Sequence, residues 1–140
     1  MSLIVNPFDR SDLFLETKHH AIVAEAISRA DGEKPFKRYI DAWWLALCIG
    51  VRKDHRVKLS GDTTKFNDGG IFSSDPWRII HLQLLGLSWL GSTALDHPTQ
   101  IIQLSSEYVN GGIEWIVDTI HGQPNRTLAI YNRISEFESS

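Results

Sequence analysis

Residues 36–53 read FKRYIDAWWLALCIGVRK, and this stretch decides the fold that the sequence predicts. Its large apolar side chains recur at steps of three and four residues, which is the period of a buried helix face. These side chains are Phe36, Ile40, Trp43, Trp44, Leu47 and Val51. Two adjacent tryptophans cannot both lie on one narrow seam, so we expect a helix that opens at Pro35, packs on two sides and forms the core.

Further helices are predicted on both sides of this one. Thr17 can cap a helix over residues 18–30, which the Asp-Gly pair at 31–32 should end. The Ser-Asp-Pro sequence at 74–76 predicts a helix that runs to about Leu90, where Gly91 stops it. That helix should bury four apolar side chains: Trp77, Ile80, Leu84 and Leu87.

Glycines divide the C-terminal part of the prediction. A helix should begin near Pro98, and the sequence Asn110-Gly111-Gly112 should break or kink it, because two glycines cost about 2 kcal/mol in a helix interior. A short helix then follows, and a final amphipathic helix is expected over residues 125–136.

The remaining segments show no regular period. We expect residues 1–16 to be an irregular N-terminal arm and residues 54–73, which are polar and glycine-rich, to be a long loop. No alternating pattern indicates a strand of useful length. The sequence therefore predicts an all-α fold, a single compact domain over residues 1–140 with about five to six helices.

Composition places the chain among ordinary globular proteins. Of its 140 residues 42% are apolar, and a lone Cys48 between Leu47 and Ile49 is expected to be a buried, inert thiol, which suits a reducing compartment. The N-terminus lacks the charge and apolar length of a signal peptide, and no apolar run is long enough to span a membrane. We therefore expect a cytoplasmic protein with no membrane partner.

Charge is unevenly distributed along the chain. The net charge is −3, yet residues 34–65 hold eight basic and three acidic residues, a local excess of +5. Four of these cations follow the central helix: Arg52, Lys53, Arg56 and Lys58. Such a run could bind phosphates without reading bases, or an acidic protein surface; the alternative is a solvated helix exit with no ligand.

No arrangement of residues predicts catalysis strongly. Asp12, Glu16 and Lys18 have the spacing of a metal-dependent nuclease motif, but that motif requires a strand, so we expect a chance occurrence on a solvated helix N-terminus. Glu107 and Glu114 would share a face with Asp118 only if the glycine break were absent. Metal-ligand spacings among the histidines and cysteine, nucleotide loops and nucleophile motifs are not found, so we expect no metal, no cofactor and no enzyme.

Three segments resemble the small proteins associated with bacterial DNA phosphorothioation gene clusters. Residues 36–52 are similar to the opening motif of that family, and residues 70–87 to its Ile-Phe element and leucine-rich helix. Residues 107–114, EYVNGGIE, are close to the family's Glu-Tyr-Ala-Asn-Gly-Gly-Leu-Glu. The similarity extends over residues 34–121.

This resemblance implies an accessory component of a DNA-modification or restriction defence system, without an established catalytic role. It suggests a non-enzymatic protein that contacts DNA or a larger defence-system protein through the four cations. The motif residues would form a shaped turn: Glu107, Tyr108, Asn110, Gly111, Gly112 and Glu114. Self-association is left open. The alternatives are a helical DNA-binding transcriptional regulator, which needs a dimer and a recognition helix, and a scaffold with an aromatic patch facing a partner.

Overall fold

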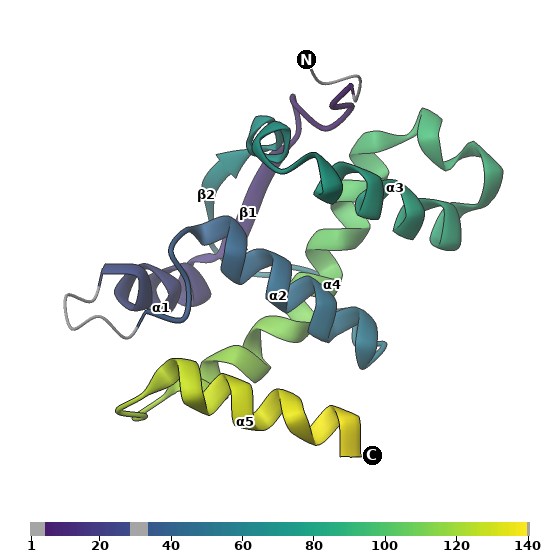
Figure 1. The fold of residues 1–140 in the computed structure, drawn as a ribbon. Coiled ribbons are helices and arrows are strands. Elements are labelled where there is room, and N and C mark those ends of the chain that lie inside the picture. Colours follow the sequence, from purple (N-terminus) through teal and green to yellow (C-terminus); the bar gives the residue numbers. More distant parts are fainter. Residues whose placement is uncertain (1–4, 29–33, 140) are drawn as a thin grey trace.

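The computed structural model describes residues 5–28 and 34–139, and helices make up most of them (Figure 1). The elements follow in the order β1 (Asp12–Glu16), α1 (Thr17–Ser28), α2 (Tyr39–Arg52), β2 (Thr63–Asp68), η1 (Gly69–Ser74), α3 (Pro76–Leu90), η2 (Gly91–Asp96), α4 (Pro98–Ile120) and α5 (Arg126–Ser139), where η marks a 3-10 helix. The predicted fold class is confirmed in part, because the mainly helical chain also contains a small sheet. The described helices include none that is both long and apolar enough to cross a membrane.

Helices α2 and α4 cross at the centre of the molecule, with α3 and α5 on either side of the crossing (Figure 1). The crossing forms most of the core, in which Trp43 and Leu47 of α2 are buried with Ile113 and Ile116 of α4. The central position predicted for the helix of residues 36–53 is therefore confirmed. It begins at Tyr39 rather than after Pro35, and the Asp41 carboxylate accepts a hydrogen bond from the Arg38 backbone N–H at that end.

The predicted break at Asn110-Gly111-Gly112 is wrong, because α4 runs unbroken from Pro98 to Ile120. The glycines serve close packing instead of a turn. A Cβ on Gly112 would overlap the Ala46 carbonyl oxygen of α2, and one on Gly50 would overlap the Tyr108 carbonyl oxygen of α4. Glycine on both helices thus lets the two backbones touch, and this packing offsets the low helix propensity of glycine.

The irregular arm and the long loop are also corrected by the structure. Strand β1 lies within the predicted arm and pairs antiparallel with β2, which lies within the predicted loop, and the register shifts between Leu13 and Phe14. Leu13 and Leu15 point into the core while Phe14 is exposed. The end of the predicted loop, from Gly69 onward, lies in η1 (Gly69–Ser74), which buries Phe72.

Helix α3 begins at Pro76 and ends before Gly91 as predicted, but it is rotated from the expected orientation. Its buried residues are Arg78, Ile79, Leu82 and Gly86. The four side chains that we expected to be buried are exposed instead: Trp77 by 46%, Ile80 by 44%, Leu84 by 57% and Leu87 by 38%. Cys48, expected in the core, is also exposed.

The start of α4 at Pro98 is confirmed, and α5 follows the predicted C-terminal helix closely. Helix α1 begins at Thr17, whereas the predicted end of that helix at residues 30–32 lies outside the described residues.

Candidate nucleic-acid interface

The basic segment, residues 52–58, reverses the chain at the end of α2. Asp54 has a positive φ of 50°, and the His55 backbone N–H donates to the Gly50 carbonyl at 2.9 Å. The Val57 N–H then donates to the Glu107 backbone carbonyl of α4 at 3.0 Å. These bonds fix the segment along the surface of α4.

Residues of the predicted motif turn hold this same segment. Asn110 donates its side-chain amide to the carbonyl oxygens of Val57 at 3.1 Å and Lys58 at 3.3 Å. Gly111 leaves room for the His55 carbonyl, which a Cβ would overlap. The sequence predicted a motif and a basic run separately, and the structure brings them into contact.

Tyr108, two residues before Asn110 on α4, adds to this contact. Its hydroxyl lies 3.4 Å from an Asp54 carboxylate oxygen, and its ring stacks on Trp89 with the centroids 5.0 Å apart. The motif is therefore not a turn but a surface in the middle of α4, which we call the seat of the basic segment. The basic segment contacts four of its residues, Glu107, Tyr108, Asn110 and Gly111. Gly112 contacts α2 instead.

Asn110 also joins the basic segment to the end of strand β1. One Glu16 carboxylate oxygen accepts from the Asn110 amide at 3.1 Å and from the Ser60 N–H at 2.9 Å. Glu16 is only 6% exposed. Burial alone would raise its pKa, but these two hydrogen bonds, with His19 and Lys18 nearby, lower the pKa below its usual value.

The last motif residue, Glu114, lies beside a buried histidine. His19 Nε2 is 3.9 Å from the Glu114 carboxylate, and His19 Nδ1 is 3.9 Å from Glu16. Burial lowers the pKa of His19 despite these two carboxylates, so the neutral imidazole is favoured at physiological pH. Our expectation of a solvated triplet is wrong for Glu16, which is buried at the end of a strand.

The paired carboxylates also differ from the sequence-based expectation. The unbroken helix α4 removes our objection to Glu107, Glu114 and Asp118 sharing a face, yet Glu107 is buried while the other two are exposed. Among residues 5–28 and 34–139, no group of three or more His, Cys, Asp or Glu side chains is arranged to hold a metal ion.

The four cations are exposed but lie in two neighbourhoods. Arg56, whose side chain is 51% exposed, lies 3.6 Å from the buried Glu107 carboxylate. Arg52 donates to the Phe137 carbonyl at 3.2 Å, and both Arg52 and Lys53 lie 5.9 Å from the centroid of the Phe137 ring. One pair of cations therefore lies beside α5 and the other beside α4.

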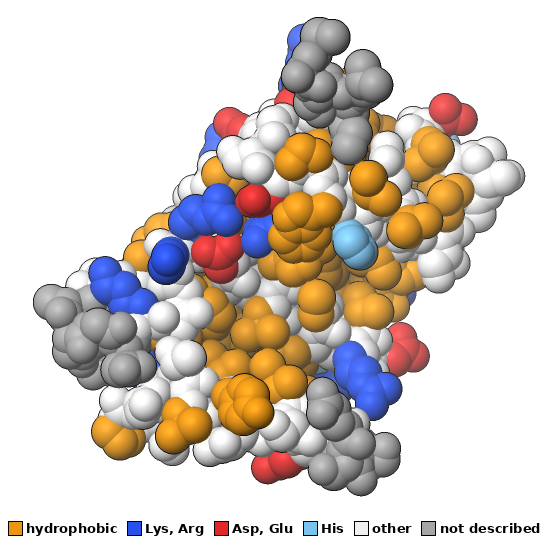
Figure 2. All heavy atoms as spheres, viewed as in Figure 1, with side chains coloured by type: hydrophobic (Ala, Val, Ile, Leu, Met, Phe, Trp, Pro, Cys, Tyr) orange, Lys and Arg blue, Asp and Glu red, His pale blue; other side chains and the backbone are white. Residues whose placement is uncertain are grey.

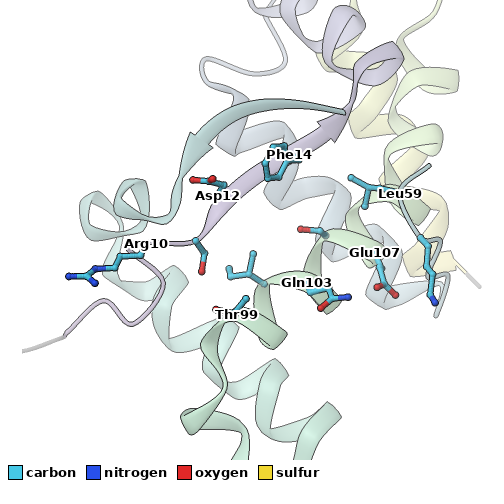
Figure 3. Close-up of a pocket in the computed structure, with 11 residues that line it drawn as sticks. Arg10, Asp12, Phe14, Leu59, Thr99, Gln103 and Glu107 are labelled. Atoms are coloured by element: carbon cyan, nitrogen blue, oxygen red, sulfur yellow. The ribbon is translucent and has the colours of Figure 1, made fainter. Parts of the chain in front are cut away.

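Lys58 borders a cavity of about 570 Å³ between β1 and α4 (Figure 3). Figure 3 shows Arg10 at one end and Leu59 at the other, with Phe14 between them. Of the acids that line it, Asp12 is paired with Lys65 at 2.9 Å and Glu107 with Arg56. Sequence reasoning missed Arg10 and Phe14, because only the strand places them near the basic segment.

Comparison with known proteins places most of the chain in one family. A family model described as DNA sulphur modification system-associated protein 4 matches residues 16–140. No curated protein and no solved structure was found to match the chain. The matched region includes the basic segment, its seat on α4 and the Glu16 contact. The chain belongs to the DNA sulphur modification system-associated protein 4 family.

Proposed function

We propose that this protein is a non-enzymatic accessory component of its DNA sulphur modification system and contacts the DNA backbone through Arg52, Lys53, Arg56 and Lys58. One observation carries this assignment: the motif residues of α4 hold the basic segment in place. Asn110 binds two of its carbonyl groups, and the Glu107 carbonyl accepts from its backbone.

A fixed backbone matters because phosphate contacts depend on position as well as charge. Flexible side chains lose conformational entropy when they bind, and a segment that is already ordered loses less. Exposed Lys and Arg side chains displace counterions from the DNA without reading base edges. The seat thus favours a sequence-independent contact with phosphates.

The Arg56–Glu107 pair is compatible with such a contact. The Arg56 side chain is 51% exposed, so its guanidinium group can contact a phosphate while it stays 3.6 Å from the buried Glu107 carboxylate. Lys58 has no acidic partner within 4.0 Å in the described part of the chain, and its ammonium group is available.

The absence of catalysis is part of this proposal. What supports it is that the Glu16 carboxylate accepts hydrogen bonds from Asn110 and Ser60, which gives this carboxylate a role in holding the segment. The hydrogen bonds also account for its lowered pKa without a catalytic role.

Fluorescence anisotropy with a labelled duplex at low salt tests the DNA contact. We expect the double variants R52A/K53A and R56A/K58A each to bind more weakly, and equally so on two unrelated sequences. K34A/K37A is the matched control, because it removes two exposed cations outside the basic segment. An equal loss in the control, or no loss in the other two variants, would contradict the proposal.

A helical transcriptional regulator is the less favoured alternative. The exposed face of α3 carries Trp77, Ile80, Leu84 and Leu87 and no cation, so it is poorly suited to a DNA groove. The same apolar face supports contact with a protein.

A further inference from the structure

Helix α3 presents an apolar stripe to solvent. Its exposed members Trp77, Ile80, Leu84 and Leu87 are separated by three, four and three residues. This spacing is the one with which a helix packs along another helix. The opposite face of α3, with Ile79 and Leu82, packs on the core. Packing within the chain therefore does not bury the stripe.

A trough lies beside this stripe, with the outer face of α2 as its floor. Two hollows of about 390 Å³ each share Cys48 and Arg52. Trp77 and Leu85 of α3 line one hollow, and Ile134 and Phe137 of α5 line the other. Figure 2 shows hydrophobic side chains gathered over this face, from α3 across α2 to α5.

The aromatic wall of the trough is held in place from below. Arg78 is buried and donates to the Asp41 carboxylate at 3.1 Å and to the Ile40 carbonyl at 3.3 Å. Its guanidinium group lies 4.8 Å from the centroid of the Trp77 ring and 5.2 Å from that of the Trp44 ring. Trp77 is therefore a fixed anchor, and a fixed aromatic anchor is what binding hot spots require.

The charges around the trough indicate what covers it. Arg52 lines both hollows, and Lys53 follows it. Counting only the side chains that the structure describes, which end at Phe137, neither cation has an acidic group within 4.0 Å. The exposed face of α3 offers no carboxylate, so the same stripe on a second copy of this chain could not pair with them.

We propose that the trough and the α3 stripe, which meet at Trp77, together bind an amphipathic α-helix of a partner protein, one with apolar residues at three- and four-residue steps and acidic residues along one edge. The apolar side chains would cover the α2 floor and the α3 wall, and the carboxylates would pair with Arg52 and Lys53. This is the helix-in-groove mode of recognition. The apolar part of this surface does not depend on the DNA contact, but the two contacts share Arg52 and Lys53, so a bound helix would leave only Arg56 and Lys58 of the four cations to the phosphates.

Two synthetic helical peptides provide the probe. Both carry the same leucine stripe over about 18 residues, long enough to form an isolated helix, and one is flanked by Glu and the other by Lys. We expect the Glu peptide to bind at least about tenfold more tightly in fluorescence anisotropy, and I80Q/L84Q to lose about tenfold or more of that affinity. L128Q is the control, because Leu128 is similarly exposed but lies on α5, outside both the α3 stripe and the two hollows.

Crossed variants separate this surface from the DNA contact. I80Q/L84Q should leave duplex binding unchanged, and R56A/K58A should leave peptide binding unchanged. Equal affinity for the two peptides, no affinity for either, or no loss in I80Q/L84Q would overturn the inference. A dimer in light scattering that I80Q/L84Q dissociates would assign the trough to a second copy instead, and would also overturn it.

Discussion

At the residue scale, Asn110 connects three parts of the molecule. Its amide nitrogen lies within hydrogen-bond distance of acceptors on Glu16, Val57 and Lys58, which share its two hydrogens, and so ties β1 and the basic segment to α4. Buried acceptors that lose such a donor cost free energy because water cannot replace it. The sequence indicated that Asn110 belongs to a motif, but we predicted a turn there. The three partners of Asn110 lie more than 50 residues away along the chain, so no local pattern reveals them.

Replacing Asn110 with alanine should lower the free energy of unfolding by about 1–3 kcal/mol, because Glu16 and two carbonyl groups lose their donor. Urea denaturation followed by circular dichroism measures this change. N132A is the control, since Asn132 is exposed on α5. An equal effect in the two variants would show that the Asn110 contacts contribute little.

Glu16 should give stability a dependence on acid pH. Its pKa in the folded protein lies below the ordinary value of about 4.3, so the ionised carboxylate stabilises the fold at neutral pH. This contribution is lost as pH falls through the folded value. We expect the difference in unfolding free energy between the wild type and E16Q to shrink below about pH 4; a difference that is constant or grows toward acid would contradict the assignment.

At the scale of elements, the crossing of α2 and α4 shows how far sequence patterns lead. The period of residues 36–53 predicted the central helix, and Ser-Asp-Pro predicted the start of α3. Glycine propensity suggested a break in α4 because the sequence does not show that the backbone of α2 fills the space above Gly112. Tertiary packing overrides local propensity there.

The sheet and the rotation of α3 were missed for related reasons. Strand β1 has five residues, and its partner lies about 50 residues later in a polar segment, so no local period marks the pair. Helix α3 is apolar on both faces, so its sequence pattern does not tell which face points inward. In the structure Arg78 lies on the inward face, buried beneath Trp77. The site was predicted as two separate parts, and their contact depends on the fold.

Gly112 should not tolerate even the smallest side chain. In an ordinary helix interior, a Gly→Ala change stabilises by about 1 kcal/mol, but here the new Cβ would overlap the Ala46 carbonyl. We expect G112A to lose about 1–3 kcal/mol of unfolding free energy, as overpacked cores do. Thermal and urea denaturation would measure it, with the exposed S88A on α3 as the control for helix propensity. A stabilised G112A would contradict the close crossing.

At the scale of the whole molecule, the two proposed surfaces are made of exposed cations and exposed apolar side chains that do not pack in the core. The basic segment lies on the motif of α4, and the apolar trough lies over α2 between α3 and α5. Arg52 and Lys53 stand where the two surfaces meet, whereas Arg56 and Lys58 belong to the basic segment alone. A net charge of −3 makes general attraction to DNA weak, so the DNA contact that we propose depends on the local cations.

The salt dependence of duplex binding tests the central claim most directly. If all four cations contact phosphates, the logarithm of the association constant should fall with the logarithm of salt concentration at a slope of about −3 to −4. In R56A/K58A the slope should become shallower by about two, and in K34A/K37A it should stay unchanged. A slope near zero in the wild type, or equal slopes in all three proteins, would contradict the claim that the basic segment binds DNA.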